Sequence, residues 1–161
     1  MKQDRFLFGI LIFIGVLVLA ALALFFVRNE KPAYGAENTP EGVLYNYAVA
    51  LQLHDYPRAY GYLARKDNQP TYTTFYQAFL TRQLDTSTSA LQIGNVQMLT
   101  IDQAWVNVTI QSVGSGLLNN GWSNTDKGTL EKQNGAWKIT FLPNPFWGYD
   151  WYQPTPVPVK P

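Results

Sequence analysis

The residues that could carry nucleophilic or metal chemistry are few in this sequence, and their spacing is not that of a catalytic site. His54 is the single histidine, and one histidine cannot build a multi-histidine metal site. The chain has no cysteine, which excludes thiolate catalysis, thiolate metal sites and disulfides. Ser115 lies in Val-Gly-Ser-Gly-Leu, which lacks the Gly-x-Ser-x-Gly spacing of a nucleophile elbow. We therefore predict no catalytic residue, no metal site and no cofactor.

The carboxylates have simpler structural interpretations than acid–base catalysis. An isomerase-like site would need an acidic base facing a pocket, together with a tyrosine or a protonated acid as oxyanion donor. No carboxylate stands out on an apolar face of a predicted element. Helix caps and ends, turns and one ion pair with Lys138 account for Asp55, Asp85, Asp102, Asp126 and Glu131.

The element that indicates where the chain is located in the cell is an unbroken apolar run of 22 residues over positions 6–27. As a helix, such a run spans a hydrocarbon core of about 30 Å. We predict a transmembrane helix over 6–27, a cytoplasmic tail over 1–5, a polar tether over 28–38 and a domain outside the cytoplasm. The alternative is a cleaved signal peptide, but the run is long for one and the small-residue site Ala33-Tyr34-Gly35 lies far from it.

Three helices are expected next. Thr39 can cap the first, which carries one apolar stripe as far as His54. Asp55 is expected to cap a second, shorter helix. A third is expected to begin near Thr71 or Thr73, because apolar residues recur there at helical spacing.

After Asp85 the apolar period changes from about 3.6 to 2, which predicts an antiparallel sheet. Strands are expected over 91–98, with a bulge at Gly94-Asn95, and over 104–111. Residues 114–127 are interpreted as a polar, glycine-rich loop.

A hairpin is expected at the end of this sheet, with strands 128–133 and 136–142 joined by Asn134-Gly135. A two-residue turn there pairs Glu131 with Lys138 on one face. The same register pairs Leu130 with Ile139 on the other face.

Helices followed by a curved antiparallel sheet indicate an α+β domain. The segments His54–Tyr60 and Asn134–Ile139, in this element order, are those on which the chain resembles the nuclear transport factor 2-like superfamily, which includes ketosteroid isomerase. The resemblance covers roughly residues 39–143 and is closest to membrane-anchored bacterial members. It implies three helices packed on a curved, cone-shaped antiparallel sheet. Because this superfamily includes enzymes, ligand carriers and structural proteins, the resemblance implies no particular activity.

Aromatic residues supply the candidate binding sites. The cone implied by the resemblance could hold an apolar pocket with hydroxyl groups, and the alternative is that the same side chains fill the core. The pocket candidates are Tyr47, Tyr60, Tyr76 and Phe79.

Residues 144–161 form an aromatic and then proline-rich tail, and the proline-rich part is expected to be solvated. The aromatic part contains Trp147 and Trp151. We expect it to cover the sheet as a flap; contact with a membrane or with a second subunit are the alternatives. The interface candidates are therefore Trp105, Trp147 and Trp151.

We expect a membrane-anchored accessory domain in the cell envelope that binds a protein partner or a small apolar ligand without catalysis. The alternative is an enzyme or a lipid-handling protein that uses the cone cavity. Residues 36–161 hold eight Lys or Arg and nine Asp or Glu, so they lack the basic surface of a nucleic-acid-binding domain. A homodimer could form through the sheet face that bears Trp105, Asn107, Thr109 and Gln111.

Overall fold

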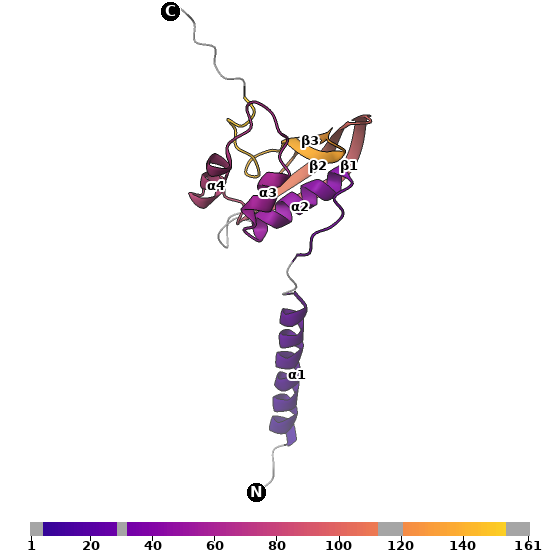
Figure 1. The fold of residues 1–161 in the computed structure, drawn as a ribbon. Coiled ribbons are helices and arrows are strands. Elements are labelled where there is room, and N and C mark those ends of the chain that lie inside the picture. Colours follow the sequence, from indigo (N-terminus) through magenta and orange to yellow (C-terminus); the bar gives the residue numbers. More distant parts are fainter. Residues whose placement is uncertain (1–4, 29–31, 113–120, 154–161) are drawn as a thin grey trace, which may run out of the picture. The chain divides into compact units, whose positions relative to one another are not determined.

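The computed structural model describes residues 5–28, 32–112 and 121–153, and the chain divides into two compact units, residues 1–33 and 34–161. The first unit contains helix α1 (Arg5–Arg28) (Figure 1). Its segment Phe6–Leu24 is long and apolar enough to cross a membrane, a test that a signal sequence also passes. The helix predicted over 6–27 is present.

The second unit contains three further helices, each of which begins at the predicted cap. The side chains of Thr39, Asp55 and Thr71 each accept a hydrogen bond from a backbone amide in the first helical turn. His54 follows the first of these helices with a φ of 58°, so it ends the helix as expected. The helices are α2 (Pro40–Gln52), α3 (Tyr56–Gly61) and α4 (Tyr72–Leu80).

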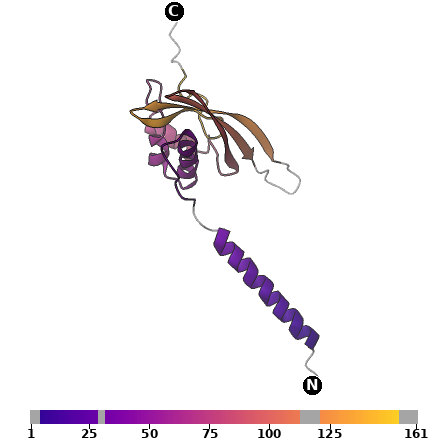
Figure 2. The same ribbon diagram turned by 90° about the vertical axis from the view of Figure 1, so that its right-hand side faces the viewer.

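The predicted α+β class is confirmed, because these helices pack with one curved antiparallel sheet. Its strands follow one another in the order β1-β2-β3-β4. Figure 2 shows the helices on one side of the sheet and the other side open. The strands are β1 (Ser89–Thr100), β2 (Gln103–Ser112), β3 (Trp122–Gln133) and β4 (Ala136–Phe141).

The predicted hairpin register is confirmed. Leu130 pairs with Ile139 and Glu131 pairs with Lys138. The turn residues Asn134 and Gly135 have φ values of 51° and 81°, as a type I′ turn requires. The predicted bulge is also present, since the β1–β2 register shifts between Ile93 and Val96.

Strand β3 begins at Trp122, six residues before the expected start at residue 128. Residues 122–127, interpreted from their polarity as loop, pair with β2 from Asn107 to Ser112. All six are exposed, so no apolar alternation indicates this half of the strand. Asp126, expected in a turn, is therefore a strand residue. The remainder of the predicted loop, up to residue 120, lies largely outside the described residues, and so does Ser115.

The side chains of Glu131 and Lys138 do not bond to each other, although the residues are paired in register. Glu131 forms an ion pair with Lys66, with an Oε2–Nζ distance of 2.7 Å. The Lys138 ammonium donates to the carbonyl of Gly61 at 2.6 Å, and burial lowers its pKa. The first contact joins β3 to the segment that follows α3, and the second joins β4 to the last residue of α3.

The core lies between the helices and the inner face of the sheet. Alternate residues of β2 point into it, which explains the predicted period of 2. Its fully enclosed members include Val43, Leu44, Tyr47, Ala50, Ala59, Phe75, Ala104, Val106, Val108, Ile110, Ile139 and Leu142.

The packed part of the second unit begins at Tyr34, within the segment 28–38 that was expected to be a tether. The fully buried amide of Asn46 accepts from the backbone N–H of Gly35 at 2.7 Å and donates to its carbonyl at 3.1 Å. The side chain thus bonds to both backbone groups of Gly35, as a neighbouring strand would. These two bonds attach the segment that precedes α2, here called the incoming segment, to that helix.

Candidate functional site

The segment that follows β4 is held against the domain at both ends. The phenol of Tyr47 donates to the carbonyl of Phe146 at 2.7 Å. At the other end, the backbone N–H of Tyr152 donates to the carbonyl of Asn68 at 3.1 Å, and its phenol donates to the carbonyl of Ala64. Residues 144–152 thus form a loop fixed at its two ends, which we call the aromatic loop.

Two tryptophans of the aromatic loop complete the core. Trp147 and Trp151 are only 2% and 5% exposed. The Trp151 ring lies 5.4 Å from that of Phe75 and 5.2 Å from that of Trp147, between ring centroids. Glycine at position 148 permits this packing, because a Cβ there would overlap the Trp151 indole. The loop is therefore a covering flap, the arrangement expected from the sequence.

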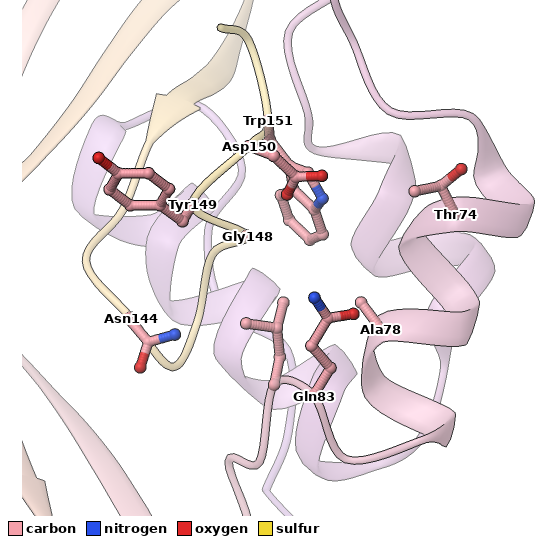
Figure 3. Close-up of a pocket in the computed structure, with 9 residues that line it drawn as sticks. Thr74, Ala78, Gln83, Asn144, Gly148, Tyr149, Asp150 and Trp151 are labelled. Carbon is pink, nitrogen blue, oxygen red and sulfur yellow. The ribbon is translucent and has the colours of Figure 1, made fainter.

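Two hollows open on either side of the aromatic loop. The α4 hollow, of about 440 Å³, lies between the loop and α4 (Figure 3). Figure 3 shows the side-chain amide of Gln83 near its centre, with Ala78 on the α4 side and Asn144 on the side of the loop. It is lined by Thr74, Ala78, Gln83, Leu84, Asn144, Gly148, Tyr149, Asp150 and Trp151.

The β3 hollow, of about 340 Å³, lies between the loop and the first half of β3. Asn124 and Asp126 pair with Ile110 and Val108, whose side chains are buried, so both residues belong to the inner face of the sheet. The other lining residues are Phe141, Leu142, Pro143, Asn144, Trp147, Gly148, Tyr149, Trp151 and Gln153.

Both hollows combine aromatic walls with carboxylate or amide groups and contain no cationic side chain among their lining residues. Asp126 lines the β3 hollow and Asp150 lines the α4 hollow. Each carboxylate adds negative charge at an aromatic surface, whose face also attracts cations. Such a lining suits a neutral or positively charged ligand with an apolar body, and it disfavours an anion.

The four predicted pocket residues line neither hollow. Tyr47 is enclosed in the core, and burial raises its pKa well above the ordinary value. Tyr60 donates to the carbonyl of Pro70 at 2.8 Å. Tyr76 is half-buried against Tyr56, and Phe79 is buried beside Phe75.

Of the three predicted interface residues, only Trp105 reaches the surface. It lies half-buried on the outer face of β2, and the Lys127 ammonium lies 4.2 Å from its ring centroid. On the same face, Asn107 and Gln111 are exposed, and Thr109 forms a 3.0 Å hydroxyl hydrogen bond with Thr125.

The chain has a second polar cluster, at Arg58. The Arg58 guanidinium lies 3.4 Å from the ring centroid of Tyr34 and 2.8 Å from Oε1 of Glu37. Tyr62 donates to the same Glu37 oxygen at 2.7 Å. These hydrogen bonds, first that of Tyr62 and then that of Arg58, lower the pKa of the Glu37 carboxyl. The cluster binds the incoming segment to α3, which is a structural role.

His54 is exposed and packs edge-on to Tyr56, with ring centroids 5.9 Å apart. Among the described residues, no group of three His, Asp or Glu side chains is placed to hold a metal ion.

Trp147 and Trp151, which line the hollows, were singled out from the sequence, but the polar lining residues were not. Asn124 and Asp126 were assigned to a loop, and Gln83, Asn144 and Asp150 were not singled out. The available signal was the period-2 placement of Asn124, Asp126 and Gly128, which continues the inner face of the hairpin strand backward.

No family model matches this sequence, and no curated protein matches it. Several solved structures are similar to it in fold, including the following two. One is an NTF-2-like protein of unknown function from Shewanella oneidensis MR-1, with a TM-score of 0.46 and 14% identity over 61% of this chain and 88% of that one. The other is a SEC-C motif-containing protein from Rhodopseudomonas palustris, with a TM-score of 0.49 and 13% identity over 66% and 79%. Similarity at this level carries no inference about function.

Proposed function

We propose that this chain is a membrane-anchored binding module that holds a small ligand with an apolar body and a neutral or cationic polar group. The β3 hollow is the proposed site. The observation that carries the proposal is the aromatic loop, which supplies a fixed apolar wall opposite Asn124 and Asp126 on the sheet. A pocket with mostly apolar walls and a few convergent polar groups is the usual form of a small-molecule site.

The ligand class follows from charge. Asp126 is exposed at the hollow, and its Oδ1 accepts from the Lys127 backbone N–H at 2.7 Å. An ammonium or hydroxyl group of a ligand could use its other oxygen. An enzyme of the isomerase kind would instead need its carboxylate enclosed in the cavity, and both Asp126 and Asp150 are exposed.

We also propose that α1 spans a membrane, with the domain outside the cytoplasm. The support for the span is the length of α1, 24 residues or about 36 Å as a helix. Membership of the nuclear transport factor 2-like superfamily is proposed on the same element order that suggested it, three helices and then a curved antiparallel sheet.

The ligand proposal is tested with two probes that share a phenylethyl body and carry opposite charge, phenethylamine and 3-phenylpropanoate. Saturation-transfer NMR on the full chain in lipid nanodiscs, with empty nanodiscs subtracted, measures their binding. We expect the amine to bind and the carboxylate to bind at least about threefold more weakly, because each exposed charge contributes up to about 1 kcal/mol.

Two matched variants show which of the two hollows binds the probe. Asp126→Asn should weaken amine binding about three- to fivefold, and Asp150→Asn, which removes the same charge from the α4 hollow, should leave it unchanged. Equal binding of both probes would contradict the ligand class. Weakening by Asp150→Asn alone would move the site to the α4 hollow.

Membrane anchoring is tested separately. The full chain should remain in the membrane fraction after carbonate extraction. Because the chain lacks cysteine, Tyr149→Cys should react with an impermeant maleimide on intact cells. Release by carbonate, or labelling only after lysis, would contradict the anchor or its orientation.

A further inference from the structure

The two edges of the sheet differ. The outer edge of β4 is covered by the chain itself, since Ile139 donates to the carbonyl of Tyr62 and accepts from the amide of Ala64, both at 2.8 Å. The opposite edge is β1, and among the described strands it pairs only with β2. Its outward backbone groups are therefore the ones available to another strand.

Strand β1 lacks the features that usually prevent pairing at an edge. Proteins commonly protect a free edge with charged residues, proline or a bulge. From Thr86 to Ile101 the sequence contains neither a charged residue nor proline. The protective features that β1 does have are two register irregularities, the bulge at Gly94-Asn95 and a second one between Met98 and Thr100. Large apolar side chains are also exposed beside this edge: Met98 is 51%, Leu99 40% and Ile101 80% exposed.

We propose that β1 pairs antiparallel with β1 of a second copy of this chain, which joins two four-stranded sheets edge to edge. The absence of charge favours a second copy as the partner, because a twofold axis pairs β1 with an identical strand. A charged strand would oppose like charges in that arrangement, and β1 has none.

The bulge indicates the register. Leu91 and Ile93 lie on the inner face of the sheet before it, and Val96 and Met98 lie on the same face after it, as their pairing with buried residues of β2 shows. An axis at the bulge sets Leu91 against Met98 and Ile93 against Val96, apolar against apolar on the inner face. The same axis sets Gln92 against Gln97 on the outer face. Each half of β1 is thus complementary to the other half.

The natural lack of cysteine makes a direct test possible. Gln92→Cys and Gln97→Cys are made separately in the full chain, at two exposed positions, and each is purified in detergent. Mild oxidation of the mixture should give a disulfide-linked dimer, because opposed residues of antiparallel strands lie about 5 Å apart, within disulfide reach. Each variant alone should remain uncrosslinked, because its two cysteines would be about five residues apart along the strands.

A charge variant tests the same pairing without cysteine. The double variant Gln92→Lys/Gln97→Lys opposes two pairs of ammonium groups across the interface and should raise the dimer dissociation constant about tenfold or more in sedimentation equilibrium. Gln52→Lys/Gln77→Lys, the same two changes at exposed positions of α2 and α4, should not change it.

Other outcomes overturn the proposal. Crosslinking of Asn107→Cys, on the outer face of β2, would show that the sheets associate face to face. A dimer that does not crosslink in the mixture and is insensitive to Gln92→Lys/Gln97→Lys would show association through α1. A monomer at all concentrations, or crosslinking of Gln97→Cys alone, would refute this pairing.

Discussion

The phenol of Tyr47 donates a 2.7 Å hydrogen bond to the carbonyl oxygen of Phe146, across 99 positions of sequence. Tyr47 lies at the centre of α2 and is fully enclosed. Its hydroxyl supplies the partner that the Phe146 carbonyl needs inside the core. One side chain of the first packed helix thus fixes the loop that forms both hollows.

Replacing this hydroxyl should loosen the aromatic loop. Tyr47→Phe leaves the buried carbonyl of Phe146 without a partner, which should lower the free energy of unfolding by about 1–3 kcal/mol. Urea unfolding of the full chain in detergent, followed by tryptophan fluorescence, measures the change. Tyr45→Phe, at a 41% exposed position of the same helix, is the control and should change it little. Equal stability of the two variants would contradict a role for the hydrogen bond.

Glycine at position 148 is required by Trp151. In Gly148→Ala the new methyl group would overlap the indole, so Trp151 must move outward. We expect a loss of about 1–3 kcal/mol and a red shift of the tryptophan emission. Gly61→Ala in α3, where a Cβ meets nothing within 4 Å, should be neutral or slightly stabilising. An unchanged emission spectrum in Gly148→Ala would show that the loop tolerates the methyl group.

The amide of Asn46 should decide whether the incoming segment stays bound. Asn46→Leu leaves the N–H and carbonyl of Gly35 without this partner. We expect a loss of about 1–3 kcal/mol and new protease cleavage near Gly35, because the released backbone becomes accessible. The exposed Asn38→Leu is the control. Cleavage at the same rate in both variants would argue against this attachment.

Acid should weaken the Arg58 cluster through Glu37. The pKa of Glu37 is lower in the folded chain than its ordinary value of 4.5, because Tyr62 and then Arg58 donate to the carboxylate. A lowered pKa stabilises the fold above pH 4.5, and this contribution is lost as pH falls through the folded value. The difference in urea midpoint between wild type and Glu37→Gln should therefore be full at pH 7 and shrink as the pH falls below 4.5. A difference that stays constant below pH 4.5 would assign it to packing instead of charge.

Alkali should weaken the attachment of Tyr152. Burial raises the pKa of its phenol above the ordinary value of 10.0. The folded chain therefore keeps a proton that the unfolded chain releases, and stability falls as pH rises above 10. Tyr152→Phe should reduce this alkaline loss, and Tyr149→Phe, at a 93% exposed position, should not. Urea midpoints at pH 8 and pH 10.5 measure both effects.

Local rules were sufficient for much of the fold. Thr39, Asp55 and Thr71 cap their helices because a short polar side chain before an apolar stripe satisfies the free amides of the first turn. The register of the Asn134-Gly135 hairpin followed from turn geometry and one apolar pair. The first half of β3 could not be found this way, because Asn124 and Asp126 are inner-face residues that remain exposed.

The sequence by itself determined the apolar helix, the three capped helices and the hairpin, because these depend on residues close together in the chain. Tertiary structure alone decided the candidate site. Asp126 meets the aromatic loop only because β3 extends past the part of the sheet that the core fills. Trp147 and Trp151 became core residues because Tyr47 and Phe75, about 70–100 positions earlier, offer a hydrogen bond and an aromatic surface to this loop. Such contacts form only when distant parts of the folded chain come together, and no local sequence pattern encodes them.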